Sequence, residues 1–465
     1  MKTYYARQHT GYLILIVAFF SWTVTQLRAD ETLKDRIDRL AQPYLDAEIV
    51  VGMTIGVRQD GKATIVGYGQ LAGDDPRRPD GDTVYEIGSV SKVFTGILLG
   101  DAAARGQVKL EQPVQEMLPP NVRMPLNEER PITFQDLSTH VSGLPPLPDN
   151  FQPADITNPY ADYTVEQLYA FLSDHKLRRS PGTKSEYSNL AVGLLGHVLA
   201  VRAEQSYERL LREQIADPLE MLDTNVTLDD KLRRQLAKPH LGDGTATTNW
   251  DIPTLAGAGA ICSTVNDMLR FVKANLNPPE GEIGQAIETA WKIYQPPLTE
   301  EGFAMGLGWH VARDGQTHWH SGQTGGYHAM VLINRPLEIG VVLLANTATM
   351  ELDRLAEDII RMCGGAKVEP RKFDAPLVVA DEVMQRYVGQ YELAPNFVFT
   401  VSTEGGKLMV GVTGQAVHQV FAKSDTQWYY KVVPATLNFD VDDEGNCTSL
   451  ELFQNGVRQQ AKRIE

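Results

Sequence analysis

The chain has 465 residues, of which 43% are apolar and 22% are charged. This composition is that of a folded globular protein, and the length suffices for two or three domains, each with a hydrophobic core of its own. The formal net charge is −16. A general nucleic-acid binder is therefore not expected, because phosphate backbones attract an excess of Lys and Arg. The same charge argues against attachment to membranes through a basic surface.

The N-terminus has the pattern of a targeting segment. Lys2 and Arg7 precede an apolar run over residues 12–24 (YLILIVAFFSWTV). This run is shorter than the roughly 20 residues of a membrane-spanning helix and is typical of the core of a signal peptide. We therefore predict a signal peptide over residues 1–29 and export to the periplasm or the medium after its cleavage. An uncleaved N-terminal membrane anchor is the alternative. No later run is long and apolar enough to span a membrane, so none is expected in the mature chain.

Cysteine usage indicates neither a disulfide scaffold nor a metal site. The three cysteines are Cys262, Cys363 and Cys447. They form no C-x-x-C pair, and no histidine cluster has the spacing of zinc ligands. We expect buried free thiols, with a single bridge as the alternative, and no metal.

The larger, N-terminal part of the chain begins with strands, continues with helices and returns to strands. A β-branched run over 49–57, a turn at Asp60 and a second run over 63–68 predict a hairpin. Helical spacing starts at Ser89 and stops near Gly106. Further helices are expected at 164–172, 190–201, 207–215, 264–274 and 352–362. Further strands are expected at 327–334 and 339–346. This order predicts an α+β fold in which helices pack on an antiparallel sheet.

A domain boundary is predicted where Gly, Pro and charged residues gather, in the sequence GGAKVEPRKFDAP. We assign 30–365 to the first domain, 366–378 to a linker and 379–465 to a small β-barrel or sandwich. Strand-like runs in this last part lie at 387–391, 398–402, 407–412, 427–433 and 448–453. No internal repeat or low-complexity segment is present.

The first candidate for chemistry is the S-x-x-K pair of Ser89 and Lys92. Residues three apart on a helix lie on one face, and a Ser hydroxyl becomes a good nucleophile when a neighbouring base takes its proton. A Lys amine can be that base if burial lowers its pKa. A helix N-terminus at Ser89 would favour developing negative charge. The alternative is that Ser89 only caps the helix. A second match, at Ser173 and Lys176, ends a predicted helix instead of opening one.

Two further motifs follow along the chain. Tyr187-Ser188-Asn189 is the only Y-x-N, and a phenol near a cation can carry protons while the amide binds a substrate amide. His320-Ser321-Gly322-Gln323 would let a substrate backbone lie against a strand edge. A tyrosine that merely opens a helix and a structural histidine satisfied by hydrogen bonds are the alternatives.

The three motifs occur in a fixed order, at 89, 187 and 320, with a mainly helical region between them. With this order the chain resembles the serine β-lactamase and penicillin-binding-protein superfamily, nearest to class C β-lactamases, D-alanyl-D-alanine peptidases and related esterases. The resemblance covers roughly residues 35–360 and extends to three further segments. These are FQDLSTHVSGLP over 134–145, GAGAICST over 257–264 and GLGW over 306–309.

The resemblance implies a role for each matched residue. Ser89 would be the nucleophile that becomes acylated, and Lys92 would hold or relay its proton. Tyr187 would activate Ser89 and later the deacylating water; which of Lys92 and Tyr187 is the base stays open. Asn189 would bind the substrate's acyl-amide carbonyl. The backbone N–H groups of Ser89 and Gln323 would form the oxyanion hole, and neither a metal nor an organic cofactor is implied.

One departure from the family pattern concerns the third motif. Many β-lactamases have Lys where this chain has His320, followed by Ser321 and Gly322 in the substrate-binding strand. His is mostly neutral at pH 7, so an Arg elsewhere would have to bind a substrate carboxylate. The resemblance of the C-terminal part to lipocalin-like modules of some peptidases points the same way, toward peptidase, amidase or esterase chemistry.

The sequence thus predicts a β-lactamase-like fold followed by a small all-β barrel. The expected function is that of an exported serine hydrolase that acts on an amide or ester, most of all in a D-amino-acid peptide of cell-wall type. The alternatives are a class C-like β-lactamase, a short-chain esterase and a noncatalytic binding or scaffold protein. The expected partner is a small-molecule or peptide substrate, and no oligomeric state is predicted.

Overall fold

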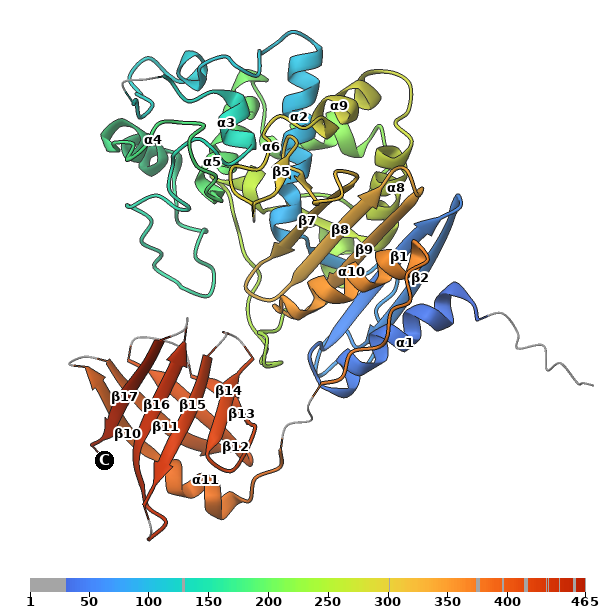
Figure 1. Cartoon of the computed structure of the whole chain (residues 1–465). Helices are drawn as coiled ribbons and strands as arrows, with labels where there is room; N and C mark the ends of the chain where they lie inside the picture. Colours follow the sequence, from blue (N-terminus) through green and yellow to red (C-terminus); the bar gives the residue numbers. More distant parts are fainter. Residues whose placement is uncertain are drawn as a thin grey trace, which may run out of the picture.

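A computed structural model of the chain describes residues 31–464, except 128–129, 301, 374–376, 395–396, 414–416, 432, 434, 443 and 455–456 (Figure 1). The predicted signal peptide lies outside these residues. Within them, no helix is both long and apolar enough to cross a membrane. Cys262, Cys363 and Cys447 are all buried and free, as expected.

The first domain is built on an antiparallel sheet with the strand order β2-β1-β9-β8-β7-β6-β5. The sheet joins distant parts of the chain, because β1 pairs with β9 from Met53↔Ala345 to Arg58↔Gly340. Every residue of β8 and β9 is buried, as in strands covered on both faces. The strands are β1 Gly52–Gln59, β2 Lys62–Gly69, β5 Ala304–Met305, β6 His310–Val311, β7 Thr317–Gln323, β8 His328–Asn334 and β9 Ile339–Ala345.

Helices cover both faces of this sheet. One face packs against α1 (Leu33–Asp46) and α10 (Glu351–Cys363), which share a hydrophobic core with β1 and β9. The other face packs against α8 (Val265–Leu276) and the helical region around α2 (Ser91–Ala104). α2 is mainly apolar and buried along nearly its whole length, as expected for a central helix. The remaining elements of the domain are β3 Val84–Glu86, α3 Phe134–Ser138, α4 Val165–Asp174, α5 Asn189–Arg202, α6 Tyr207–Leu211, α7 Asp230–Gln235, β4 Cys262–Thr264 and α9 Glu282–Trp291.

The C-terminal part is a closed barrel of eight antiparallel strands, in which β10 pairs with β17. The expected small β-barrel is therefore confirmed, and the sandwich is excluded. Its core is filled by side chains, among them a stacked pair of Tyr387 and Phe439. The elements are α11 Asp381–Tyr387, β10 Gly389–Ala394, β11 Phe397–Glu404, β12 Lys407–Val412, β13 His418–Ala422, β14 Gln427–Tyr430, β15 Ala435–Val441, β16 Cys447–Gln454 and β17 Val457–Arg463.

Several predicted elements differ from the structure. Tyr387 was expected to open a strand, but it ends α11 and places its ring in the barrel core. The predicted helix over 207–215 is α-helical only to Leu211 and continues as a π turn, Arg212–Ala216. β17 gave no signal because its sequence, VRQQAKR, is almost wholly polar.

Among the described residues, Lys431 and His418 of the barrel contact the first domain. The Lys431 amine donates hydrogen bonds to the carbonyls of Ala47 and Glu48, at 3.2 Å each, just beyond the end of α1. A cation is favourable there because helix C-termini carry partial negative charge. The second contact joins His418 of the barrel to Asp243, with Nδ1 and Oδ2 3.6 Å apart.

We predict that Lys431→Met loosens the barrel from the first domain, because the two carbonyls lose their donor. Limited proteolysis should then cleave the linker at 366–378 several-fold faster than in the wild type. Lys423→Met is the matched control, since the exposed Lys423 amine lies over the Tyr429 ring of the same barrel, 5.3 Å from its centre. Equal cleavage rates in Lys431→Met and the wild type would contradict the docking role.

Candidate active site

The candidate nucleophile lies in a short turn between a strand and the central helix. β3 leads into a 3₁₀ turn, Gly88–Val90, from which α2 continues. Gly88 has a positive φ of 49°, and a Cβ on it would lie 2.7 Å from the backbone nitrogen of Gln323, so only glycine fits. The N-cap of α2 is Val90, and Ser89 makes no capping bond. The alternative that Ser89 merely caps a helix is therefore excluded.

The Lys92 amine lies beneath Ser89 and is fully buried. Its Nζ atom lies 2.8 Å from Ser89 Oγ, 2.8 Å from Asn189 Oδ1 and 2.7 Å from the Ala258 carbonyl. Burial lowers the pKa of Lys92 well below its ordinary value. A neutral amine has two hydrogens and one lone pair. Because the amide and carbonyl oxygens can only accept, the lone pair is left for the hydroxyl of Ser89, the one partner that can donate.

Tyr187 faces the same serine from the other side. The residue is 40% exposed, but its hydroxyl end is enclosed by protein. Burial raises the pKa of the phenol, and the neighbouring Ser89 hydroxyl only partly offsets this effect. Tyr187 is thus a neutral phenol, and the Lys92 amine lies 4.8 Å from the centre of its ring. The next residue, Ser188, caps α5 by accepting the N–H of Ala191 at 2.9 Å. The tyrosine is therefore held at the start of a rigid helix.

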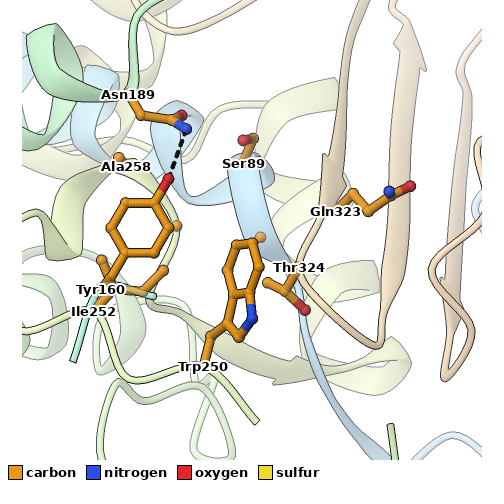
Figure 2. Close-up of a pocket in the computed structure, with 10 residues that line it drawn as sticks. Ser89, Tyr160, Asn189, Trp250, Ile252, Ala258, Gln323 and Thr324 are labelled. Carbon is orange, nitrogen blue, oxygen red and sulfur yellow. Dashed lines mark hydrogen bonds between the residues drawn. The ribbon is translucent and has the colours of Figure 1, made fainter. Parts of the chain in front are cut away.

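A small, open hollow lies in front of Ser89. Figure 2 shows its aromatic side, formed by Tyr160 and Trp250, whose ring centres are 5.4 Å apart. Asn189 bridges the site and this side, because its Nδ2 donates to the Tyr160 hydroxyl at 3.1 Å. Buried Glu86 accepts the backbone N–H of Trp250 at 3.0 Å and fixes its position. The lining residues are Gly88, Ser89, Tyr160, Asn189, Trp250, Ile252, Ala258, Gly259, Gln323 and Thr324.

The sequence analysis missed three of these contributors, Tyr160, Trp250 and Glu86. Tyr160 and Trp250 lie in irregular segments outside the three motifs, and Glu86 ends a short strand. No spacing rule connects them to Ser89, because the hollow is assembled from loops far apart in sequence.

The third motif lies on β7, but His320 does not line the hollow. Its ring lies next to those of Tyr187 and His310, with centres 6.3 and 5.0 Å away. Burial lowers the pKa of His320 well below its ordinary value, and nearby His310 and Lys92 act in the same direction. The imidazole is therefore neutral. No Arg or Lys is found among the residues that line the hollow, so this wall offers no positive charge to a substrate carboxylate.

At Gly322 and Gln323, β7 packs closely against the turn that contains Ser89. A Cβ on Gly322 would lie 2.0 Å from the Ile87 carbonyl oxygen and 2.9 Å from the Ser89 nitrogen. This close approach brings the turn of Ser89 and the end of β7 together, as an oxyanion hole made from the Ser89 and Gln323 backbone N–H groups would require. β6 pairs with β7 only at His318 and Trp319. Within the described chain the outer edge of β7 from 320 to 323 has no strand partner.

The fold and the site together define a serine hydrolase of the β-lactamase type. The chain belongs to the Beta-lactamase family, whose model matches residues 37–362. Residues 379–463 match a second family, described as a domain of unknown function.

Two curated relatives and one solved structure illustrate the similarity. The D-alanyl-D-alanine-carboxypeptidase/endopeptidase AmpH of Escherichia coli K12 is 31% identical over 292 residues, which are 60% of this chain and 74% of AmpH. A Beta-lactamase of Pseudomonas fluorescens is 27% identical over 351 residues, 68% of this chain and 93% of the relative. A class C beta-lactamase structure, 24% identical, superposes with a TM-score of 0.65 over 73% of this chain and 99% of its own, which shows the shared fold.

We predict that Gly322→Ala slows labelling of Ser89 by a fluorophosphonate about 100-fold, the scale of losing one oxyanion donor. The added methyl group meets backbone atoms, so β7 must move away from the turn. Gly73→Ala is the control, because a Cβ there meets nothing within 4 Å. Labelling of Gly322→Ala at the wild-type rate would show that the close approach is not needed.

Proposed function

We propose that this chain hydrolyses amide bonds through an acyl-enzyme on Ser89. The observation that carries the proposal is the 2.8 Å contact between the Ser89 hydroxyl and the buried Lys92 amine. In the proposed reaction the lone pair of Lys92 takes the Ser89 proton while Oγ attacks the substrate carbonyl. The backbone N–H groups of Ser89 and Gln323 receive the developing negative charge. Tyr187 donates its proton to the leaving nitrogen, and the C–N bond breaks.

The second half of the reaction uses the same groups in reverse. As the amine departs, the proton that Lys92 took from Ser89 passes to Tyr187, and both groups regain their starting states. A water molecule then loses a proton to the Tyr187–Lys92 pair and attacks the ester carbonyl. The bond between the acyl carbon and Ser89 Oγ breaks, and the pair returns that proton to Oγ. Asn189 stays between Lys92 and the hollow throughout, and its amide suits the acyl-amide group of a peptide.

For the substrate we propose an internal amide bond next to a D-amino acid, as in cell-wall peptides. The similarity to AmpH, named a carboxypeptidase/endopeptidase, supports the peptide class. The unpaired edge of β7 can add a peptide as a further strand. The uncharged wall of the hollow favours an internal bond over a terminal one, because a free C-terminal carboxylate beside it would find no cation. The predicted signal peptide would bring the chain to such substrates.

Intact mass spectrometry with penicillin tests the acyl-enzyme. We expect an adduct with the wild-type protein that is absent in Ser89→Ala. An adduct that persists fits a peptidase that deacylates poorly. A transient adduct with consumption of penicillin would replace the peptidase proposal by a β-lactamase. Absence of labelling with both penicillin and a fluorophosphonate would overturn the acyl-enzyme proposal.

The preference for an internal bond predicts the effect of C-terminal charge. A D-alanyl-D-alanine peptide whose C-terminus is amidated should be cleaved with a kcat/KM at least equal to that of the free acid. Cleavage is followed by liquid chromatography of the products, with Ser89→Ala as the blank. A kcat/KM at least tenfold higher for the free acid would instead indicate a carboxylate-binding carboxypeptidase.

The roles of Lys92 and Tyr187 predict a pH profile for acylation. Protonation removes the lone pair of Lys92, so the rate should fall about tenfold per pH unit below its lowered pKa and be flat above it. If the Tyr187 phenolate were the base, its raised pKa would make the rate still climb through pH 9 and 10. Stopped-flow acylation by a chromogenic substrate between pH 4 and 10 separates these two profiles.

A further inference from the structure

We infer that His140 is a positioning residue that holds the phenol of Tyr187 against Ser89. The inference rests on the proposed function in that it assigns Tyr187 a proton-transfer role. His140 belongs to the FQDLSTHVSGLP segment, to which the proposed reaction gives no part. It follows α3 in the chain and is 2% exposed. Its ring packs against the ring of Tyr187.

The backbone of His140 is the first part of this support. It has a φ of +59°, a left-handed conformation that is uncommon outside glycine and that His, like Asn and Asp, adopts more often than most residues. In this conformation the His140 carbonyl accepts the N–H of Glu186 at 2.8 Å, and the adjacent Val141 carbonyl accepts the N–H of Gly182 at 2.7 Å. His140 is thus bonded to the loop that leads into Tyr187.

The side chain of His140 supplies the second part. Its Nδ1 atom accepts the backbone N–H of Ser188 at 3.2 Å. Together with the bond from Glu186, one residue holds the chain on both sides of Tyr187. The imidazole also packs against the phenol ring, with ring centres 4.5 Å apart and planes at 37°. Tyr187 therefore cannot turn away from Ser89 without breaking a contact to His140.

The charge state of His140 matters for the same geometry. Because Nδ1 accepts a hydrogen bond, the ring proton lies on Nε2 and the imidazole is neutral. Burial lowers the pKa of His140 well below its ordinary value, and Lys92 and His310 add to the effect. A charged imidazole would lose the bond from Ser188 and repel any proton taken up by Lys92.

Two substitutions at this position separate positioning from simple core packing. His140→Asn keeps an acceptor at nearly the same distance from the backbone and tolerates a left-handed φ. His140→Leu keeps the bulk but removes the acceptor. Because Tyr187 gives its proton to the leaving group, a displaced phenol should slow acylation by a peptide amide far more than acylation by a nitrophenyl ester, whose leaving group departs unprotonated. Single-turnover measurements isolate acylation from deacylation, in which Tyr187 also takes part.

We expect His140→Leu to lower the single-turnover acylation rate with a peptide amide 10- to 100-fold, the scale of an ångström-sized displacement, with the acylation rate on the ester and the KM for the amide changed less than threefold. His140→Asn should recover most of the amide activity. In a Tyr187→Phe background, His140→Leu should have no further effect on the amide. An equal loss on amide and ester, which a partly unfolded protein would give, overturns the inference.

Crystal structures of the wild type, His140→Leu and His140→Asn keep this test separate from the proposed function. If the wild type cleaves neither substrate, the proposed function fails, and the position of the phenol still decides the role of His140. We expect the Tyr187 hydroxyl to move away from Ser89 in His140→Leu and to stay in His140→Asn. An unmoved hydroxyl in His140→Leu would overturn the inference.

Discussion

The buried amine of Lys92 is the constraint on which the rest of the site depends. Taking an amine out of water favours its uncharged form, and only this form has a lone pair for a proton. A carboxylate nearby would stabilise the charged amine, which could not accept a proton. No such partner contributes here, because burial alone accounts for the lowered pKa of Lys92. The neighbours are consistent with this need, since burial also lowers the pKa values of His140, His310 and His320 and keeps these rings uncharged. The amine is thus surrounded by uncharged hydrogen-bonding groups.

This arrangement requires three separate parts of the chain to meet at atomic contact. The turn before α2 supplies the serine and lysine, the start of α5 supplies Tyr187 and Asn189, and β7 supplies the strand edge. Contact between the first and third parts depends on Gly88 and Gly322, where a side chain would collide with backbone atoms. The second part contains His140, whose left-handed backbone is retained beside Tyr187.

The sequence predicted most of the framework and the central chemical groups. Strands β8 and β9 were visible as unbroken apolar runs, and the first hairpin as a β-branched pair around a turn, because their burial leaves a regular pattern. The three motifs could be matched because Ser89 and Lys92, and Tyr187 and Asn189, are each close in sequence. Elements with weak apolar patterns, such as β17, were missed. The wall formed by Tyr160 and Trp250 was also missed, since it depends on the paths of loops that only tertiary packing determines. The neutral, buried state of His320 could not be read from residue type either.

The pairing of β1 with β9 has a consequence for the order in which the chain can fold. About 290 residues separate Met53 from its partner Ala345, and contacts of such long sequence separation form late because a long loop must close first. α1 shares its hydrophobic core with α10, so this core is also incomplete until α10 has been synthesised. During synthesis the first domain therefore leaves the ribosome with its central sheet open until the last of its strands has emerged. The barrel pairs mostly neighbouring strands within some 80 residues, so it can close soon after its last strand has been synthesised. The two domains therefore reach their native structures at different times.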